Sequence, residues 1–425
     1  MMMGMSIEVG SRPMERVPAA TRVLSVDALG PDGLSALEAL GCSLWSRTRL
    51  GTNDPETAVA LLDPNVLVVR SSRVDRRVLE AGRSLSLVVR AGAGVDNIDV
   101  AAASARGIFV ANCPGKNAMA VAELAWGLIL ACDRKIPDQT FDLREGLWKK
   151  AHYADSRGLY GRTLGVVGLG SVGREVAERG KAFGMRVLAW SRRLTPARAA
   201  ELELGYSDNL IDLARVSDVV SLHVAATAET EGLIGRSFFD ALKPGATFVN
   251  TSRGSVVDQP SLLAAIRSKG LRVGLDVYGQ QPKAGDDKFA DPALREPLVY
   301  GTHHTGASTE QAQEAVATET ARVIEHYVRT GEVLNCVNRA KPSESHALLT
   351  VRHLNKPGVL ASVFAVLGKV GVNVEEMENV ICAGGAAACA RIRLSQAISA
   401  SELDAVASHK DVLAVTLAPA ESRDK

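Results

Sequence analysis

Three residues suited to proton transfer and anion binding occur in short motifs in the second half of the chain. Arg253 lies in NTSRG, Gln281 in LDVYGQQP and His304 in THHTGAS. Each motif follows an apolar run that is typical of a buried strand. An arginine at a strand end can hold a carboxylate through two parallel hydrogen bonds. A histidine there can exchange a proton with a hydroxyl or carbonyl oxygen during hydride transfer. The pattern predicts a dehydrogenase-type site for a small anion.

Two histidines, His303 and His304, are adjacent in the last of these motifs. Neighbouring side chains of an extended segment point to opposite sides. We therefore expect only one of the two rings to face the site and the other to pack or to face solvent.

The elements that must position these residues form two series of strands alternating with helices. The first runs through RVLSVDALG, NVLVVRSS and LSLVVRAGAG, and the second from RTLGVVGLG to LVYGTHH. Continuous Val/Leu runs that alternate with helices indicate parallel sheets covered on both faces. The ligands of such sheets bind at the carboxyl ends of the strands. We predict an α/β fold with two Rossmann-like, doubly wound parallel-sheet domains.

The segment GVVGLGSVGREVA predicts a dinucleotide site. Gly168, Gly170 and Gly173 have the GxGxxG spacing between a strand and a helix. They permit a tight turn, close approach of the pyrophosphate and close helix–strand packing. The next strand ends in Arg192 and Arg193, where a carboxylate would bind the ribose of NAD. Arginines there can bind a 2′-phosphate, so both NAD and NADP stay open as the cofactor.

A third module follows a polar stretch. From ALLTVRHLNKPG onward the pattern is strand, helix, strand, strand, helix, strand, which predicts a ferredoxin-like βαββαβ domain. The predicted division of the chain comprises an N-terminal tail (1–20), a substrate-binding flavodoxin-like domain (21–116 and 309–338), a dinucleotide-binding domain (117–308), a linker (339–346) and the C-terminal domain (347–420).

Composition excludes several classes of partner. The formal net charge is +1 and aromatic residues make up 4%, so neither nucleic acid nor an anionic membrane is an expected partner. The six cysteines include no CxxC pair, which predicts reduced thiols, a cytoplasmic protein and no metal site. The most apolar stretch, AMAVAELAWGLILAC, is too short to span a bilayer.

The ordered motifs VGLGSVG, NTSRG, LDVYGQQP and HHTGASTEQAQ resemble those of the D-isomer-specific 2-hydroxyacid dehydrogenases. RAGAGVDNID and NCPGKNAMAVAELAWG resemble the substrate-domain and hinge segments of that family. The resemblance implies hydride transfer between NAD(P) and C2 of a 2-hydroxyacid, here a phosphorylated one, in a homo-oligomer. It assigns catalysis to Arg253, Gln281 and His304, with His303 in place of the family's proline. It assigns the cofactor to Gly168, Gly170, Ser171, Val172, Gly173, Ser191, Arg192, Arg193, Thr251, Ser252, Asp276 and Gly306, and the substrate to Arg70, Arg90, Gly92, Asn117 and Lys150.

Gln281 departs from the family pattern, which has a glutamate at this position. A glutamate would pair with the imidazolium and raise its pKa, whereas a neutral glutamine can only orient the ring. We therefore expect His304 to titrate lower here than in members that have the acid. A formate-oxidising member of the superfamily also has glutamine, which slightly weakens the hydroxyacid interpretation.

The C-terminal module resembles the ACT domain, an amino-acid-sensing fold. The resemblance assigns L-serine, as an effector, to His353, Asn355 and Asn373 across a pair of such domains. A purely structural, dimerising module is the alternative. For the whole chain, the alternatives are a glyoxylate or hydroxypyruvate reductase and, more remotely, a nucleotide-sensing protein like the corepressors of this fold.

Overall fold

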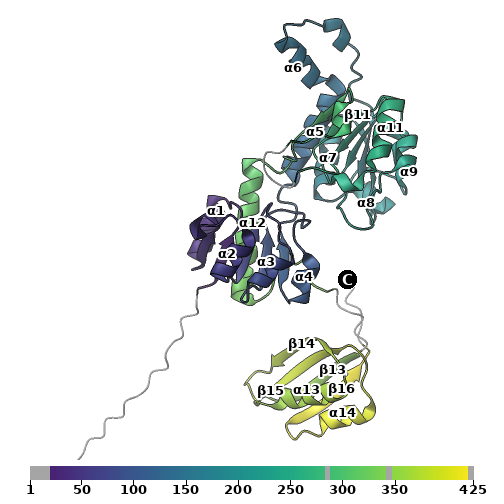
Figure 1. The fold of residues 1–425 in the computed structure, drawn as a ribbon. Helices are drawn as coiled ribbons and strands as arrows, with labels where there is room; N and C mark the ends of the chain where they lie inside the picture. Colours follow the sequence, from purple (N-terminus) through teal and green to yellow (C-terminus); the bar gives the residue numbers. More distant parts are fainter. Residues whose placement is uncertain (1–19, 283–287, 341–346, 420–425) are drawn as a thin grey trace, which may run out of the picture. The chain divides into compact units, whose positions relative to one another are not determined.

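The computed structural model describes residues 20–282, 288–340 and 347–419. The chain divides into two compact units, residues 1–338 and 339–425 (Figure 1). Nearly all of the predicted N-terminal tail and most of the predicted linker lie outside the described residues. The predicted division of the first unit into two domains stays a prediction.

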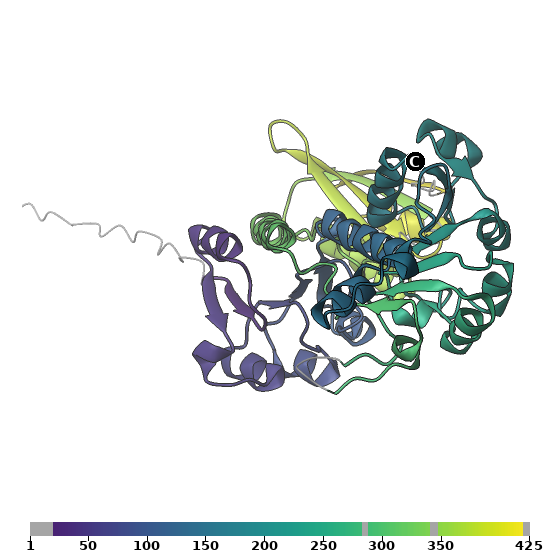
Figure 2. The same cartoon turned by 90° about the horizontal axis from the view of Figure 1, so that it is seen from above.

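The first sheet of the first unit has five parallel strands in the order β2-β1-β3-β4-β5. Its strands are β1 (Arg22–Ser25), β2 (Ser43–Ser46), β3 (Val66–Val69), β4 (Leu87–Arg90) and β5 (Phe109–Asn112). Its helices are α1 (Pro31–Ala39), α2 (Pro55–Leu62), α3 (Arg76–Ala81), α4 (Val100–Ala105) and, from much later in the chain, α12 (Glu310–Thr330), which packs on α1 (Figures 1 and 2). This 2-1-3-4-5 order is the flavodoxin-like order.

The second sheet has seven parallel strands in the order β12-β11-β10-β9-β6-β7-β8. Its strands are β6 (Thr163–Val167), β7 (Arg186–Trp190), β8 (Gly205–Tyr206), β9 (Val219–Leu222), β10 (Thr247–Asn250), β11 (Arg272–Leu275) and β12 (Val299–Gly301). Its helices are α5 (Ala118–Arg134), α7 (Ser171–Ala182), α8 (Pro196–Glu201), α9 (Leu210–Val216), α10 (Arg236–Ala241) and α11 (Gln259–Lys269). Successive strands are added in one direction from β6 to β8 and in the other from β9 to β12. The point between β6 and β9 is therefore the switch point where such sheets bind dinucleotides.

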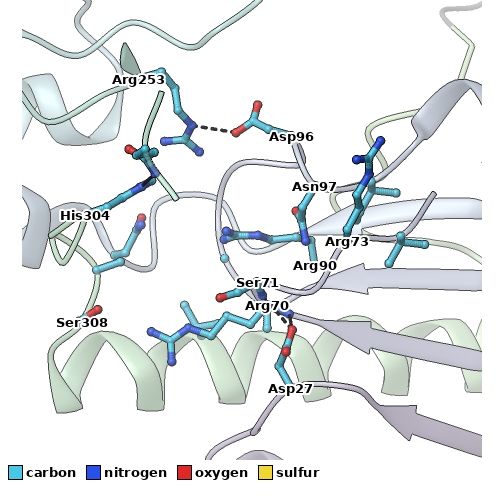
Figure 3. Close-up of a pocket in the computed structure, with 18 of the residues that line it drawn as sticks. Asp27, Arg70, Ser71, Arg73, Arg90, Asp96, Asn97, Arg253, His304 and Ser308 are labelled. Atoms are coloured by element: carbon cyan, nitrogen blue, oxygen red, sulfur yellow. Dashed lines mark hydrogen bonds and ion pairs between the residues drawn. The ribbon is translucent and has the colours of Figure 1, made fainter. Parts of the chain in front are cut away.

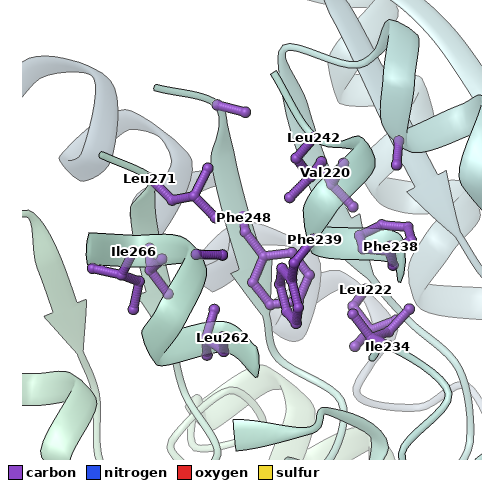
Figure 4. Packing of buried hydrophobic residues seen from close by; sticks show 14 of the residues in the cluster. Val220, Leu222, Ile234, Phe238, Phe239, Leu242, Phe248, Leu262, Ile266 and Leu271 are labelled. Atoms are coloured by element: carbon purple, nitrogen blue, oxygen red, sulfur yellow. The ribbon is translucent and has the colours of Figure 1, made fainter. Parts of the chain in front are cut away.

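Buried aromatic packing stabilises the second sheet where it carries the site. Phe238 and Phe239 of α10 pack edge to face against Phe248 of β10 (Figure 4). All three rings are at most 2% exposed. Burial of each such ring stabilises the fold by about 1.5–3 kcal/mol. This core holds β10 in place, and with it the segment that presents Arg253.

A left-handed residue separates two consecutive helices. Lys135 (φ 51°) ends α5 and begins α6 (Ile136–Arg144). Phe141 and Leu143 of α6, together with the nearby Trp148, are exposed. Among the described residues, no helix is long and apolar enough to cross a membrane.

The second unit confirms the predicted ferredoxin-like fold. Its elements are β13 (Ala347–Leu354), α13 (Val359–Lys369), β14 (Val374–Ile381), β15 (Ala387–Leu394), α14 (Ala400–Ala407) and β16 (Val412–Ala418). The four strands are antiparallel in the order β14-β15-β13-β16, which leaves β14 at an edge. All six cysteines of the chain are free thiols.

A buried carboxylate ties α12 to the segment that leads into α5. Glu319 accepts hydrogen bonds from Arg322 and from Asn335 Nδ2 (2.8 Å), and Lys116 lies 3.4 Å away. These partners, Arg322 first, lower the pKa of Glu319 from 4.5 to about 2. A depressed folded-state pKa stabilises the fold above the unfolded pKa. The contribution is therefore present above about pH 4.5 and is lost as the pH falls towards 2.

We predict that Glu319→Gln destabilises the first unit by about 1–2 kcal/mol at pH 7, a value discounted for the exposed side of this network. The variant should also lose less stability than the wild type between about pH 4.5 and 2. Urea unfolding at several pH values measures both effects. Glu325→Gln, which removes an exposed partner of Arg329 on the same helix, is the control. Equal effects of the two substitutions would contradict the assignment.

Candidate active site

A cavity of about 1130 Å³ brings seven of the predicted site residues together (Figure 3). These residues are Arg70, Arg90, Gly92, Asn117, Arg253, Gln281 and His304. Arg70 and Arg90 come from the carboxyl ends of β3 and β4, and Arg253 follows β10. Two sheets thus contribute the cationic groups, and their roles in binding and catalysis stay predictions.

His304 is positioned by a buried carboxylate. Asp276, 1% exposed, accepts hydrogen bonds from the Thr302 hydroxyl (2.6 Å), the Thr305 amide (2.8 Å) and the Gly306 amide (3.0 Å). These bonds wrap residues 302–306 around one side chain. Asp276 and Gly306, which we predicted to contact the cofactor, thus have a direct part in shaping the histidine loop.

Both His303 and His304 border the cavity. The expected alternation of their rings assumed an extended segment, whereas His304 has φ 54°, in the left-handed region. That only one of the two rings acts in the site stays a prediction. The Nδ1 atom of His304 lies 2.6 Å from Nε2 of Gln281, so the predicted orienting contact is present.

The environment of His304 disfavours its charged form. Burial is the largest cause that lowers the pKa of the ring, and the positive charge of Arg253 is the next. Asp276 acts in the opposite direction but does not outweigh them. Gln281 is not among the causes of this shift, so the expected difference from members that have a glutamate stays a prediction.

Arg253 is held between two segments. Asn250, 1% exposed, donates to the carbonyl oxygen of Arg253 (3.0 Å) and accepts from the amide of Ser252 (2.9 Å). The Nε atom of Arg253 donates to Asp96 at 2.7 Å (Figure 3). The Asp96 carboxylate thus shows that this guanidinium can hold a carboxylate in the cavity.

Arg70 is anchored through its backbone. One oxygen of Asp27 accepts from the amides of Arg70 (2.6 Å), Ser71 (2.8 Å) and Ser72 (2.9 Å). These bonds, together with the Ser72 hydroxyl, keep the pKa of Asp27 low despite its burial. The Arg70 side chain is left to extend into the cavity (Figure 3).

Arg90 folds back over Gly92 and carries an unused donor. A Cβ at Gly92, which has φ 149°, would lie 1.5 Å from the Arg90 guanidinium, so only glycine leaves room for it. The Arg90 Nε atom is buried and has no hydrogen-bond partner among the described residues. Burial, and next the nearby Arg253, lower the Arg90 pKa. An unpaired buried donor beside other cations favours an anionic ligand.

Of the other predicted substrate residues, two line the cavity and one does not. Asn117 and Gly92 line the cavity. Lys150 is exposed, in the short turn after α6, and does not line it. The structure therefore does not bring Lys150 to the site within one chain. The structure also places Asp96, Asn250 and Asp27 where they hold the site arginines. The sequence did not indicate these three residues, because their motifs resemble ordinary turns.

The glycine-rich turn fits a dinucleotide. Gly168 has φ 95°, and a Cβ at Gly173 would lie 2.0 Å from the Gly168 carbonyl oxygen. Nothing lies within 4 Å of a Cβ placed on Gly170. Ser171 and Val172 open α7, whose amino end has no side-chain cap, so its amides are available to phosphates. Next to Ser252, the buried hydroxyl of Thr251 has no partner in the described part of the chain and can take a polar group of the cofactor.

The end of β7 offers exposed cations for the ribose. Arg192 and Arg193 are exposed beyond Ser191.

Arg192→Ala combined with Arg193→Ala should raise the KM for NADP at least about tenfold, because charge-assisted bonds contribute roughly 1.5–3 kcal/mol each. The KM for NAD should change little. Steady-state kinetics with both cofactors measure this, with Arg198→Ala, paired to Glu201 on α8, as the control. Equal changes for both cofactors would contradict a role at the 2′-phosphate.

No group of three or more His, Cys, Asp or Glu side chains able to hold a metal occurs in the part of the chain that the structure describes. The arrangement is that expected of a dinucleotide-binding oxidoreductase, with a histidine and several arginines beside a Rossmann-type sheet.

Comparisons with known proteins identify the family. Residues 126–306 match the NAD-binding domain of the D-isomer specific 2-hydroxyacid dehydrogenases. The chain is 42% identical over 258 residues to hydroxypyruvate reductase of Thermotoga maritima, covering 60% of this chain and 82% of that protein. It is 37% identical over 319 residues to D-3-phosphoglycerate dehydrogenase of Methanocaldococcus jannaschii, covering 75% of this chain and 59% of that protein. The chain belongs to the D-isomer specific 2-hydroxyacid dehydrogenase family.

Solved structures agree with this assignment. NAD⁺-bound 3-phosphoglycerate dehydrogenase of Entamoeba histolytica superposes with a TM-score of 0.63 at 25% identity, over 76% of this chain and 99% of that one. An NADPH-dependent glyoxylate/hydroxypyruvate reductase of Sinorhizobium meliloti, with NADP and malonate, gives 0.65 at 27% identity, over 75% and 97%. The chain spans less than two thirds of the length of the phosphoglycerate dehydrogenases that it matches in sequence.

Proposed function

We propose that this protein oxidises D-3-phosphoglycerate to 3-phosphohydroxypyruvate with NAD(P)⁺, the entry step to L-serine. The observation that carries the proposal is the group of three arginines, Arg70, Arg90 and Arg253, in one cavity with His304. The substrate has two anionic groups, a carboxylate and a phosphate. One arginine suffices for a carboxylate, and two more fit a second, doubly charged group.

In this proposal, three arginines bind the substrate and one histidine transfers a proton. Arg253 binds the carboxylate and polarises the C2 oxygen, in the manner of its contact with Asp96. Arg90 and Arg70 bind the phosphate. His304 exchanges the proton of the C2 oxygen. When bound, the nicotinamide supplies the acceptor for the hydride that leaves C2, and one proton is released for each substrate oxidised.

A second candidate is a hydroxypyruvate or glyoxylate reductase. It is favoured by the hydroxypyruvate reductase relative, 82% of whose length this chain covers. A panel of 3-phosphoglycerate, hydroxypyruvate, glyoxylate and 2-oxoglutarate, each assayed with NAD and with NADP, distinguishes the two. Turnover of 3-phosphoglycerate supports the first candidate. Turnover of the unphosphorylated acids alone supports the second, and no turnover at all contradicts both.

The second unit is proposed to be an ACT-type effector domain. His353, 2% exposed, lies on β13 and contacts Asn379 of β14 (3.2 Å), and Asn355 follows β13. Asn373 precedes β14 at the opposite end of the sheet, beside Ser395. His353 pairs with Ala388, six residues before Leu394 on β15, which corresponds to roughly 20 Å. A single copy thus keeps Asn373 apart from His353 and Asn355.

Pairing of two copies would bring these residues close together. If the edge strand β14 of one copy pairs antiparallel with β14 of another, the Val374 end of one lies beside the Ile381 end of the other. That places Asn373 of the second copy near His353 and Asn355 of the first. Edge strands commonly gain such partners, and amide side chains suit both charged groups of an amino acid. The proposal therefore includes a homo-oligomer.

Serine inhibition tests this part of the proposal. L-Serine at millimolar concentration should inhibit the wild type, and His353→Ala or Asn373→Ala should each raise the half-inhibitory concentration at least about tenfold. D-Serine serves as the control ligand. A lack of inhibition in a protein whose second unit is folded would show that the module is structural only.

The first unit also presents a surface suited to self-association. Phe141, Leu143 and Trp148 are 58–81% exposed on and after α6. Exposed apolar groups of this density mark interaction sites. We infer that they pack against a second copy, and light scattering on the full chain measures the resulting mass.

A further inference from the structure

The amide of Gln281 lies between two groups that fix its orientation. The backbone amide of Tyr278 donates to Oε1 of Gln281 at 3.2 Å. Nε2 of the same side chain lies 2.6 Å from Nδ1 of His304. A backbone N–H can only donate, so it selects the oxygen end of the amide. The NH₂ end must then face the histidine.

This orientation determines which nitrogen of His304 carries a proton. The NH₂ group donates, so Nδ1 must accept, and the proton of the neutral ring resides on Nε2. A protonated Nδ1 would place two donors 2.6 Å apart. A glutamate at this position has only acceptors and would favour the opposite tautomer. The residue at position 281 therefore selects the form of the ring as well as its orientation.

The charged groups around the ring do not reverse this preference. Arg253 and Arg90 oppose a positive ring, whereas Asp276 and Asp96 favour it. Both carboxylates are already occupied: Asp276 accepts from Thr302, Thr305 and Gly306, and Asp96 accepts from Arg253. None of the described hydrogen bonds joins either carboxylate to the ring.

We propose that Gln281, anchored by the Tyr278 backbone amide, holds His304 in the neutral Nε2–H form and so prepares the site for a ligand whose C2 oxygen accepts a hydrogen bond, a 2-oxoacid. This inference rests on the proposed function in that His304 faces C2. To take the proton of a hydroxyacid, the ring must first move its own proton from Nε2 to Nδ1. The Gln281 amide must then turn and give up its bond to Tyr278.

The same rotation of the Gln281 amide is needed when a 2-oxoacid is reduced. Donation to the nascent alkoxide uses the imidazolium, whose Nδ1–H also requires the oxygen end of Gln281. Each proton transfer is thus coupled to a rotation of one amide. A substitution cannot change the equilibrium constant of the reaction, so it cannot change the ratio of forward and reverse efficiencies at equilibrium. The effect of the residue at position 281 must therefore appear in the protonation state of the His304 ring and in its pH dependence.

The test is nitrogen-15 NMR of the full-length protein labelled at its eight histidines. The His304 signals are those that disappear in His304→Gln. In the wild type above the ring's pKa, Nδ1 should be unprotonated and Nε2 protonated. In Gln281→Glu the proton should move to Nδ1, and the ring's titration midpoint should rise by at least about one pH unit.

Gln281→Met, which keeps the length of the side chain and removes the amide, should give a mixture of tautomers. It also serves if the glutamate variant does not fold. A wild-type ring protonated on Nδ1, or the same tautomer in the wild type and the variants, would overturn the proposal. The experiment needs no substrate. Its failure is therefore distinct from failure of the proposed function, which the substrate panel decides.

Discussion

Replacement of His304 by glutamine is expected to lower kcat by about 10²- to 10⁴-fold, the usual contribution of a positioned acid–base group. The ring lies in the arginine-lined cavity and contacts Gln281, so its loss removes the proposed proton donor and acceptor. Binding of the dinucleotide at the glycine-rich turn should be unchanged, because Gly168 and Gly173 are untouched.

His303→Gln is the matched control, because His303 lines the same cavity. It should retain kcat within about threefold. If His303→Gln abolishes turnover while His304→Gln is nearly normal, the assignment of roles to the two histidines is reversed. Cofactor binding measured by fluorescence shows whether each variant is folded.

The pH profile gives a second test of the same residue. Because burial and Arg253 lower the pKa of His304, oxidation, which uses the neutral ring, should persist to lower pH than it would with an unperturbed histidine. Reduction uses the charged ring and should decline as the pH rises through this lowered pKa. In Gln281→Glu both limbs should move to higher pH. Unchanged profiles would contradict a role for Gln281 in setting the charge.

Replacement of Arg253 by glutamine is expected to lower kcat/KM by about 10²- to 10³-fold, since loss of one partner of a close charge pair costs roughly 2–5 kcal/mol. The guanidinium already binds the Asp96 carboxylate at 2.7 Å. Arg253→Lys should recover only part of the loss, because an ammonium lacks the planar fork.

Asp96→Asn is the control for Arg253. It removes the carboxylate contact of Arg253 with Asp96 and keeps the guanidinium. Its kcat/KM should therefore change by less than about tenfold. Equal losses in Arg253→Gln and Asp96→Asn would mean that Arg253 only joins two segments of the chain and does not bind the substrate carboxylate.

Much of this architecture is predictable because its signals are local. Strand and helix alternation indicated the two parallel sheets, and the placement of Arg253, Gln281 and His304 after strands predicted that they would meet. The glycine spacing predicted the turn at Gly168, whose φ of 95° only glycine adopts readily.

What was not predictable depends on contacts between distant segments. Asp96 precedes Arg253 by 157 positions, and Asp27 precedes the amide of Arg70 by 43. No spacing rule relates such residues. The left-handed backbone of His304 accompanies the bonds of its loop to Asp276, so the rule for extended strands does not apply at this residue.

Acceptance of a phosphorylated substrate by the arginine cavity is tested most directly by comparing kcat/KM for the reduction of 3-phosphohydroxypyruvate and of hydroxypyruvate by the same preparation. Contacts of the phosphate with Arg70 and Arg90 predict a preference of at least about 100-fold for the phosphorylated acid, since each charge-assisted contact contributes roughly 1.5–3 kcal/mol. This preference should fall in Arg90→Met. Equal efficiencies, or a preference for hydroxypyruvate, would contradict the claim.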